Sequence, residues 1–396
     1  MKKKLLFCVI RMDTAGTERA LLSLLGALDF SEYDITLLLA EKEGPLLPLI
    51  PKEVRVTGLG RDGKLFSLSQ NNAKRVLFSF ALRHPTALPR IAGAALNAKK
   101  HPETRKSEAV TLFNDLVRRY FPAFEPDTEY DAVVSFSGAR TLVYAAEKVR
   151  ARKLVAWHHF TFDPKETDPI AEYAYFSRAD RIAAVSDAAA DSLKSAFPDL
   201  AEKITVFPNR TDRALIRRLA KEGERLTGSG FRILTLSRIS EKKGCVEIPA
   251  VLEWLTLAGL DCHWTLIGKD EGAKWMIEKE IRASGLSERF DCLPPTENPY
   301  GYLASADLFV LPSKNEGYPV SVEEAKALGV PSVVLPYGAA EEQLGYGAYG
   351  VVTSLLEDGV LFLARDEERR KAIRDTLLSL PEPADNTAER FRNLLV

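Results

Sequence analysis

Several residue types that would reveal a chemistry directly are scarce in this chain of 396 residues. It has four cysteines without a Cys-x-x-Cys spacing and five histidines without a zinc-ligand spacing, which argues against a disulfide framework and a structural zinc site. The net charge of −1 gives no sign of nucleic-acid binding. Each cysteine lies in or beside an apolar run, so we expect buried thiols in a reducing compartment.

Long hydrophobic runs are missing as well. The apolar segment near the N-terminus ends at Arg11, which makes it too short for the apolar region of a signal peptide. No stretch approaches the roughly 18 apolar residues of a transmembrane helix. The first segment therefore predicts a buried strand, and we expect a cytoplasmic protein.

Strand-like apolar runs alternate with helical patterns along most of the chain, which predicts an α/β fold with parallel sheets. The length suggests two domains, and residues 209–230 have the composition of a linker between them. The expected strands are 4–10, 35–40, 132–136, 154–157, 182–186 and 204–207 in the first set, and 233–237, 263–267, 290–293, 308–312, 332–335 and 350–353 in the second. Residues 384–396 look like a separate terminal helix.

Residues 60–125 interrupt this alternation. Within 71–122, ten Lys and Arg residues stand against three acidic residues, a balance of +10 − 3 = +7, with apolar residues interleaved. A basic amphipathic segment can bind an anionic membrane surface. It can equally be a solvated helical insertion over the sheet, and the sequence leaves both interpretations open.

Residues 313–335 have the pattern loop, helix and strand after the apolar run 308–312. Pro319 marks the helix start and Gly329 its end. Glu316 in the loop and Glu324 in the helix would lie at the carboxyl end of a strand, where open α/β sheets bind ligands. Carboxylates accept hydrogen bonds from hydroxyl groups, and free backbone amides bind phosphate. The combination suits a sugar nucleotide. Glutamate is also common in first helical turns for electrostatic reasons alone.

Three further places have candidate binding residues. Arg238 and Lys243 flank a strand-to-helix turn and can cradle a diphosphate, although they can also be surface charges. His158 and His159 end a strand and would point to opposite faces, and a strand-end histidine is more often structural. The loop at Gly16 feeds a helix N-terminus, but it lacks the G-x-G-x-x-G pattern of dinucleotide sites.

As a set, these motifs resemble the retaining glycosyltransferases of family 4, in particular the bacterial capsule, lipopolysaccharide and teichoic-acid group. The family signature is matched by Glu316-Gly-Tyr-Pro319, Glu324-Ala325 and Gly329-Val-Pro331. Its Arg-Leu-x-x-x-Lys-Gly motif is matched by residues 238–244, and the segments 185–186, 208–209, 298–300 and 306–307 also agree. The resemblance covers most of the chain up to about residue 353.

The resemblance implies the GT-B architecture, in which two Rossmann-like domains with parallel sheets face each other across a cleft. We therefore expect a first domain over 1–210 with the basic helical insertion near 60–125. A second, donor-binding domain would cover 211–380, and a terminal helix over 381–396 would pack back on the first domain.

The resemblance also implies residue roles. Arg238 and Lys243 would bind the donor diphosphate, Glu316 the sugar hydroxyls and Glu324 the ribose. The expected donor-binding set also includes Gly16, Gly317, Tyr318, Pro319 and Val320. The histidine expected near the reacting centre is His159, with His158 as the alternative, and Asn209 is a further possible site residue. Arg210 stands where the family often has glycine, which puts acceptor contacts there in doubt.

The implied reaction moves a hexose from a nucleotide-diphosphate sugar, with UDP expected, to a glycan or lipid-linked acceptor with retention of configuration. The chain has no Asp-x-Asp, so we expect no metal and no cofactor, with the Arg/Lys pair neutralising the leaving group. Two alternatives are a nucleotide-sugar epimerase of the same architecture and a non-catalytic partner of a related transferase. We expect a protein of cell-surface polysaccharide synthesis that can bind peripherally at the inner face of the membrane.

Overall fold

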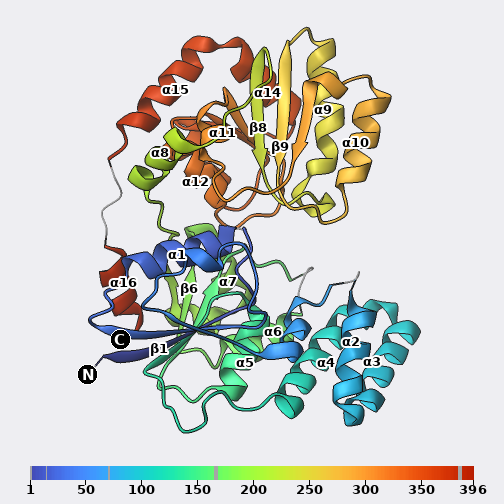
Figure 1. The fold of residues 1–396 in the computed structure, drawn as a ribbon, viewed down its shortest axis with the longest axis vertical. Coiled ribbons are helices and arrows are strands. Elements are labelled where there is room, and N and C mark those ends of the chain that lie inside the picture. Colours follow the sequence, from blue (N-terminus) through green and yellow to red (C-terminus); the bar gives the residue numbers. More distant parts are fainter. Residues whose placement is uncertain (1, 15, 70–71, 165–167, 382–385) are drawn as a thin grey trace. The chain divides into compact units, whose positions relative to one another are not determined.

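The computed structural model describes residues 2–14, 16–69, 72–164, 168–381 and 386–396. The chain divides into two compact units. The first comprises Met1–Asp13, Leu24–Pro208 and Asn386–Val396, and the second comprises Thr14–Ser23 and Asn209–Asp385. Each is described by itself below (Figure 1).

The first unit is built on a parallel sheet of seven strands in the order β3-β2-β1-β4-β5-β6-β7. Leu5 in the central strand lies opposite Ile35 on one side and Ala132 on the other. The central strands are apolar throughout because helices cover both faces of such a sheet. The strands are β1 (Lys3–Val9), β2 (Tyr33–Leu39), β3 (Arg55–Gly58), β4 (Ala132–Ser135), β5 (Leu154–His158), β6 (Arg181–Ala184) and β7 (Ile204–Val206).

Helices connect these strands, and several begin at the polar caps that their sequence provides. Asp168 accepts hydrogen bonds from the backbone amides of Ile170 and Ala171, and Ser186 accepts one from that of Ala189. The helices are α1 (Gly16–Ala27), whose residues up to Ser23 belong to the second unit, α2 (Ala73–Arg83), α3 (Leu88–Lys100), α4 (Arg105–Tyr120), α5 (Ala139–Lys148), α6 (Pro169–Phe176), α7 (Asp187–Ala196) and α16 (Thr387–Leu394).

The segment between β3 and β4 is helical, and its helices α2, α3 and α4 lie side by side at one edge of the unit (Figure 1). Aromatic rings anchor it, since Phe66 packs edge-on against Phe113, Phe121 and Tyr144. Strand β3 was not expected from the sequence because its four residues form no apolar run and none of them is fully buried at this edge of the sheet. None of the helices in the described ranges is long and apolar enough to cross a bilayer.

The second unit has a parallel sheet of six strands in the order β10-β9-β8-β11-β12-β13. Its strands are β8 (Phe231–Leu236), β9 (Cys262–Ile267), β10 (Phe290–Leu293), β11 (Leu308–Leu311), β12 (Ser332–Val334) and β13 (Gly350–Val352). Its helices are α8 (Arg213–Glu222), α9 (Ile248–Leu257), α10 (Lys274–Ala283), α11 (Tyr300–Ala304), α12 (Val320–Ala327), α13 (Ala340–Gln343), α14 (Leu356–Arg365) and α15 (Glu367–Ser379). Helices α9, α10 and α14 lie over one part of the sheet, where Trp264 and Leu266 form the core.

Residues 209–230, expected to be a linker, contain helix α8 instead. Asp212 caps this helix by accepting a hydrogen bond from the backbone amide of Leu215. Ile216 and Ala220 lie four residues apart and are buried on one face. The prediction was wrong because charged residues dominate the composition of this stretch. Most of them are exposed, but Arg213 is buried with Ile216 and Ala220 and donates to the carbonyl oxygen of Pro381 at 2.6 Å.

The terminal helix α16 packs on the first unit, as expected. The ring of Phe391 stacks on that of Phe7 with 5.9 Å between centroids, and Arg392 pairs with Glu32 at 3.0 Å. Phe391 is completely buried. The last helix is therefore part of the first unit's core, although its sequence follows the second unit.

Candidate functional site

The loops after β8 and β11 bring a predicted cation and a predicted carboxylate together. These strands are neighbours in the sheet, so their carboxyl ends lie next to each other. Nζ of Lys243 lies 2.7 Å from Oε1 of Glu316. The side chains are only 14% and 11% exposed, so water screens the pair weakly. Breaking such a buried pair by removal of one partner typically costs roughly 3–5 kcal/mol.

Gly244 explains why this turn keeps Lys243 close to the end of β11. Its φ of 68° lies in the left-handed region, and a Cβ added there would collide with the carbonyl oxygen of Pro312. Only glycine allows both the turn and the close approach. The Lys-Gly pair of the motif is thus a local structural requirement as well as a source of charge.

Arg238, the second predicted cation, has a different partner. Its Nη1 lies 3.0 Å from Oε1 of Glu271, and these side chains are 45% and 37% exposed. Sequence reasoning placed Arg238 and Lys243 in one cradle, whereas the structure gives each its own carboxylate. An exposed ion pair contributes only about 0–1 kcal/mol, so Arg238 can leave Glu271 for a stronger anion at little cost.

Glu324 lies in helix α12 and is 4% exposed. Its Oε1 accepts hydrogen bonds from the hydroxyl of Tyr300 at 2.9 Å and from Nη1 of Arg19 at 3.3 Å, all within the second unit. Burial raises the pKa of Tyr300, so its hydroxyl stays protonated and donates. Two donors thus hold this carboxylate ready to accept further hydrogen bonds at its other oxygen.

The remaining predicted donor residues lie around this loop. Gly16 begins α1 within the second unit, and a Cβ added to it would lie 3.4 Å from Cγ2 of Val320. Gly317 is buried, and Tyr318 is half-buried with a pKa that burial raises. Pro319 is the N-cap residue of α12 and has an extended conformation. The structure therefore gathers the expected set at one edge of the sheet, except for Arg238 with its separate partner.

A buried polar cluster beside this loop was missed by sequence reasoning. Oε1 of Glu323 lies 2.7 Å from Nζ of Lys326 and 3.1 Å from Nε2 of Gln343. The hydroxyl of Tyr337 donates to Oε1 of Gln343 at 2.7 Å. One signal was available in the sequence: Glu323 is adjacent to Glu324, so the two carboxylates must leave the helix in different directions. Of the two, only Glu324 belongs to the family pattern.

The two predicted histidines lie in the first unit in apolar surroundings. Nε2 of His159 lies 2.8 Å from the carbonyl oxygen of Phe136, and burial lowers its pKa to about 3. His158 lies between the rings of Phe162 and Phe176, and burial lowers its pKa to about 4. Both imidazoles are therefore neutral at pH 7. The carbonyl partner of His159 requires a proton on Nε2, which leaves Nδ1 as an acceptor.

Asn209, the last predicted site residue, is half-buried at the start of the second unit. The neighbouring Arg210 lies 3.6 Å from Asp212, and its carbonyl oxygen accepts a hydrogen bond from Ser23 at 3.1 Å. Arg210 thus has structural contacts at the position where the family often has glycine.

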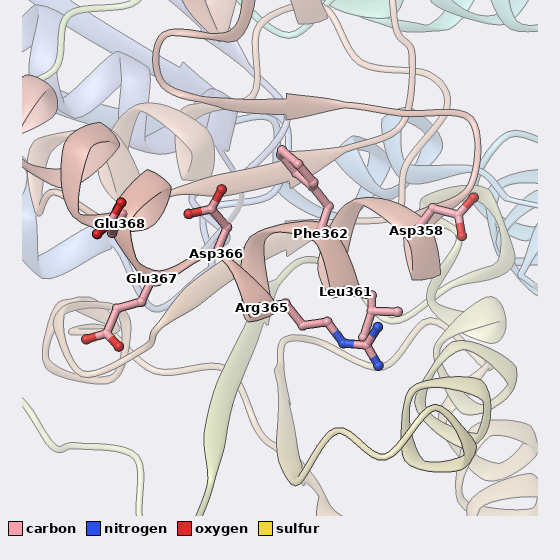
Figure 2. Close-up of a pocket in the computed structure, with 7 residues that line it drawn as sticks. All are labelled: Asp358, Leu361, Phe362, Arg365, Asp366, Glu367 and Glu368. Atoms are coloured by element: carbon pink, nitrogen blue, oxygen red, sulfur yellow. The ribbon is translucent and has the colours of Figure 1, made fainter.

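A surface hollow of about 730 Å³ lies elsewhere in the second unit, at helices α14 and α15 (Figure 2). None of the predicted site residues lines it. Its acidic side chains have a structural explanation, since Asp366 caps α15 by accepting a hydrogen bond from the amide of Arg369. Glu367 and Glu368 occupy the first turn of that helix, where negative charge is favoured. The hollow is lined by Asp358, Leu361, Phe362, Arg365, Asp366, Glu367 and Glu368.

Comparison with known proteins finds a family match in the second half of the chain. Residues 217–393 match the family Glycosyl transferases group 1. This part of the chain is therefore similar to group 1 glycosyltransferase domains. Among curated relatives, a D-inositol 3-phosphate glycosyltransferase of Paenarthrobacter aurescens is 28% identical over 44% of this chain and 45% of its own length. The amylovoran biosynthesis glycosyltransferase AmsK of Erwinia amylovora is 30% identical over 30% of this chain and 31% of its own length.

The chain spans about half or less of the length of these two relatives. Solved structures match over nearly the whole chain. Anabaena HepE in complex with UDP and glucose has a TM-score of 0.69 with 17% identity, and 99% of each chain is covered. Staphylococcus aureus TarM, solved with Fondaparinux, alpha-GlcNAc-glycerol and UDP, has a TM-score of 0.67 with 11% identity over 99% of each chain. These matches confirm the expected fold, GT-B with two Rossmann-like domains.

Proposed function

We propose that this protein is a retaining family 4 glycosyltransferase that moves a hexose from a UDP-sugar to a glycan or lipid-linked acceptor in cell-surface polysaccharide synthesis. The observation that carries the proposal is the buried Lys243–Glu316 pair beside Glu324 at the carboxyl edge of the second sheet. The glycosyltransferase domain and the UDP in the crystals of HepE and TarM support the substrate class. The relative named for amylovoran biosynthesis supports the polysaccharide role.

The proposed chemistry follows from the charges at this edge. Cleavage of the bond between the sugar and the diphosphate builds negative charge on the leaving diphosphate. Lys243 is held by Glu316 and needs little reorganisation to stabilise that charge, which lowers the barrier. Arg238 joins it by leaving its exposed partner Glu271. Glu316 then accepts hydrogen bonds from sugar hydroxyls, and Glu324 accepts them from the ribose.

These cations take the role that a metal ion has in other glycosyltransferases, so we propose that turnover does not depend on a metal or cofactor. His159, the histidine that the family resemblance implies, enters this proposal as a neutral imidazole whose Nδ1 is an acceptor. Activity should persist in EDTA, and a strict requirement for Mg²⁺ would contradict this part of the proposal.

The direct test is incubation of the protein with a panel of UDP-sugars, with and without lipid-linked and glycan acceptors. We expect slow release of UDP without acceptor and faster release with it. NMR spectroscopy of the product should show the anomeric configuration of the donor. Epimerised donor would indicate an epimerase instead, and the absence of both release and binding would indicate a non-catalytic partner.

We further propose that helices α2 and α3 contact an anionic membrane surface. Phe78 and Leu82 are 66% and 68% exposed on α2, and Leu88 and Leu96 are 56% and 55% exposed on α3. No described residue of α3 is buried, which is unusual for a helix that only supports a core. Exposed basic residues flank these apolar side chains: Lys74, Arg75, Lys99 and Lys100.

Part of the basic excess is used inside the fold, since Arg83 pairs with Asp62, and Arg90 and Arg119 pair with Asp115. The exposed basic and apolar side chains can therefore contact the phosphate headgroups and the acyl chains of a membrane surface. Flotation with vesicles of phosphatidylglycerol at low salt should bring the protein to the top fraction. Vesicles of phosphatidylcholine should not, and failure to bind the anionic vesicles would refute the membrane contact.

A further inference from the structure

The buried polar cluster of α12 and α13 has no role in the function proposed above. Glu323, Lys326 and Gln343 are 8%, 5% and 0% exposed. Besides its bond to Glu323, Lys326 donates to the carbonyl oxygen of Gln343 at 2.9 Å and lies 4.9 Å from the ring centre of Tyr349. Gln343 thus has its side chain and its backbone bound to the same ion pair.

Stability alone is a weak reason for such a cluster. A buried ion pair loses its hydration, and apolar residues of similar volume often stabilise a core equally well or better. The helix α13 that presents Gln343 is also very short, with four residues. The cluster is better explained by what it touches on its other side.

That other side is the loop between Glu316 and helix α12. Nε2 of Gln343 donates to the carbonyl oxygen of Pro319 at 2.9 Å. Burial, with the nearby carboxylate of Glu323, raises the pKa of Tyr318. The loop residue that caps α12 is therefore fixed by a side chain that is completely buried. Glu316, which pairs with Lys243, lies only two residues before Tyr318.

We propose that Gln343, held in place by the Glu323–Lys326 pair, is a positioning residue for the loop that carries Glu316. The inference rests on the proposed transferase function. Gln343 does not touch the donor in this account; it fixes the carbonyl of Pro319, so Glu316 and the loop amides keep their geometry. A misplacement of about 1 Å of a reacting group can lower turnover by about 10²-fold, so a device with this role has a measurable effect.

A pair of variants separates positioning from simple stabilisation. Lys326→Met alone leaves Glu323 buried without a cation, so we expect a lower Tm and lower activity. The double variant Glu323→Leu/Lys326→Met replaces both partners by apolar groups of similar size and should recover the wild-type Tm. We expect kcat of the double variant to remain about tenfold or more below wild type, with a smaller change in KM. Recovery of both Tm and kcat in the double variant would overturn the proposal.

Gln343→Met removes the bond to Pro319 and tests the link directly. Its loss should raise the hydrogen-exchange rates of the amides of Gly317, Tyr318 and Val320 by at least tenfold, because the loop opens more often. Unchanged exchange at these amides in both the Gln343 variant and the double variant would also overturn the proposal. This measurement needs no substrate. If wild type neither binds nor turns over a UDP-sugar, the proposed transferase function is refuted. The amide exchange rates of the loop still test the positioning role of Gln343 in that case.

Arg232 and Asp307 provide the matched control. They form an ion pair at 3.1 Å at the amino ends of β8 and β11, the opposite edge of the same sheet. The double variant Arg232→Met/Asp307→Leu removes the same types of charge without touching the loop. We expect unchanged exchange at residues 317–320 and unchanged kcat. A lower kcat or faster amide exchange in this control would mean that the loss of any ion pair in the unit has the same effect. That result would contradict a specific role for Gln343.

Discussion

The carboxyl edges of the two sheets differ at the strands that carry the predicted site residues. The second sheet ends in paired charges, with Lys243 on Glu316, Arg238 on Glu271 and donors on Glu324. In the first sheet, the end of β5 is aromatic, and His158 and His159 lie there among phenylalanines and are neutral. The same architecture thus carries a charged edge suited to a diphosphate and an apolar edge suited to uncharged contacts.

The difference also shows two ways in which a fold keeps functional groups ready. At the charged edge, ions are held by counter-ions that a stronger anion can replace. At the apolar edge, burial prevents charge from forming, so a histidine there cannot act as a cation. The predictions below test this contrast from the largest expected effect to the smallest.

Lys243→Ala should have the largest effect because it removes the buried cation of the charged edge. We expect kcat to fall by about 10²–10³-fold, as for the loss of a single preorganised donor. Stability should also fall, since the variant breaks a buried ion pair. Donor hydrolysis and urea unfolding measure the two effects. Lys242→Ala, at the exposed neighbouring position, is the control and should leave both unchanged; near-normal turnover of Lys243→Ala would refute the assignment.

Arg238→Ala should lower kcat by a similar factor of roughly 10²–10³ while it changes the unfolding free energy by less than about 1 kcal/mol. The reason is that its pair with Glu271 is exposed. The same two assays compare it with Lys243→Ala. A large loss of stability in Arg238→Ala would show that the two cations are held alike.

The histidines predict a pH dependence of stability. Their folded-state pKa values of about 4 and about 3 lie below the unfolded value of about 6.5. As pH falls below about 6.5, the unfolded chain therefore binds these protons first, and stability is lost until the folded pKa is reached. From pH 7 to pH 5 we expect a loss of roughly 2 kcal/mol per histidine.

Urea unfolding at both pH values checks this, with His158→Gln as the comparison. The variant should lose less stability over this pH range than wild type. An equal loss in both proteins would mean that His158 is protonated in the folded state, contrary to an apolar edge.

The smallest stability effect is expected at the exposed apolar side chains of α2. Phe78→Ser and Leu82→Ser should change the unfolding free energy by no more than about 0.5 kcal/mol, because both side chains face solvent. Flotation with anionic vesicles should nevertheless decrease. Leu257→Ser, at an 82% exposed position of the second unit, is the control and should keep full binding. Equal flotation of all three variants would show that Phe78 and Leu82 do not contribute to membrane binding.

The sequence allowed the alternating strands to be predicted because buried parallel strands are continuous apolar runs, as in β1 and β11. The edge strand β3 and helix α8 escaped because their partly solvated residues hide the pattern. At the site, a motif gave Glu316, Glu324 and Lys243 as candidates. It could not show that Arg238 turns to Glu271, or that Gln343 reaches Pro319 from 24 residues away. Such contacts depend on loop conformation, which spacing does not encode.

The most direct test of the central claim is thermal unfolding of wild type and Lys243→Ala with a panel of nucleotide sugars. If the charged edge binds the donor, one UDP-sugar at 100 times its Kd should stabilise wild type by about 2.7 kcal/mol. The same concentration should stabilise Lys243→Ala far less. An equal shift in both proteins, or no shift of wild type with any UDP-sugar, would contradict the assignment of this edge as the donor site.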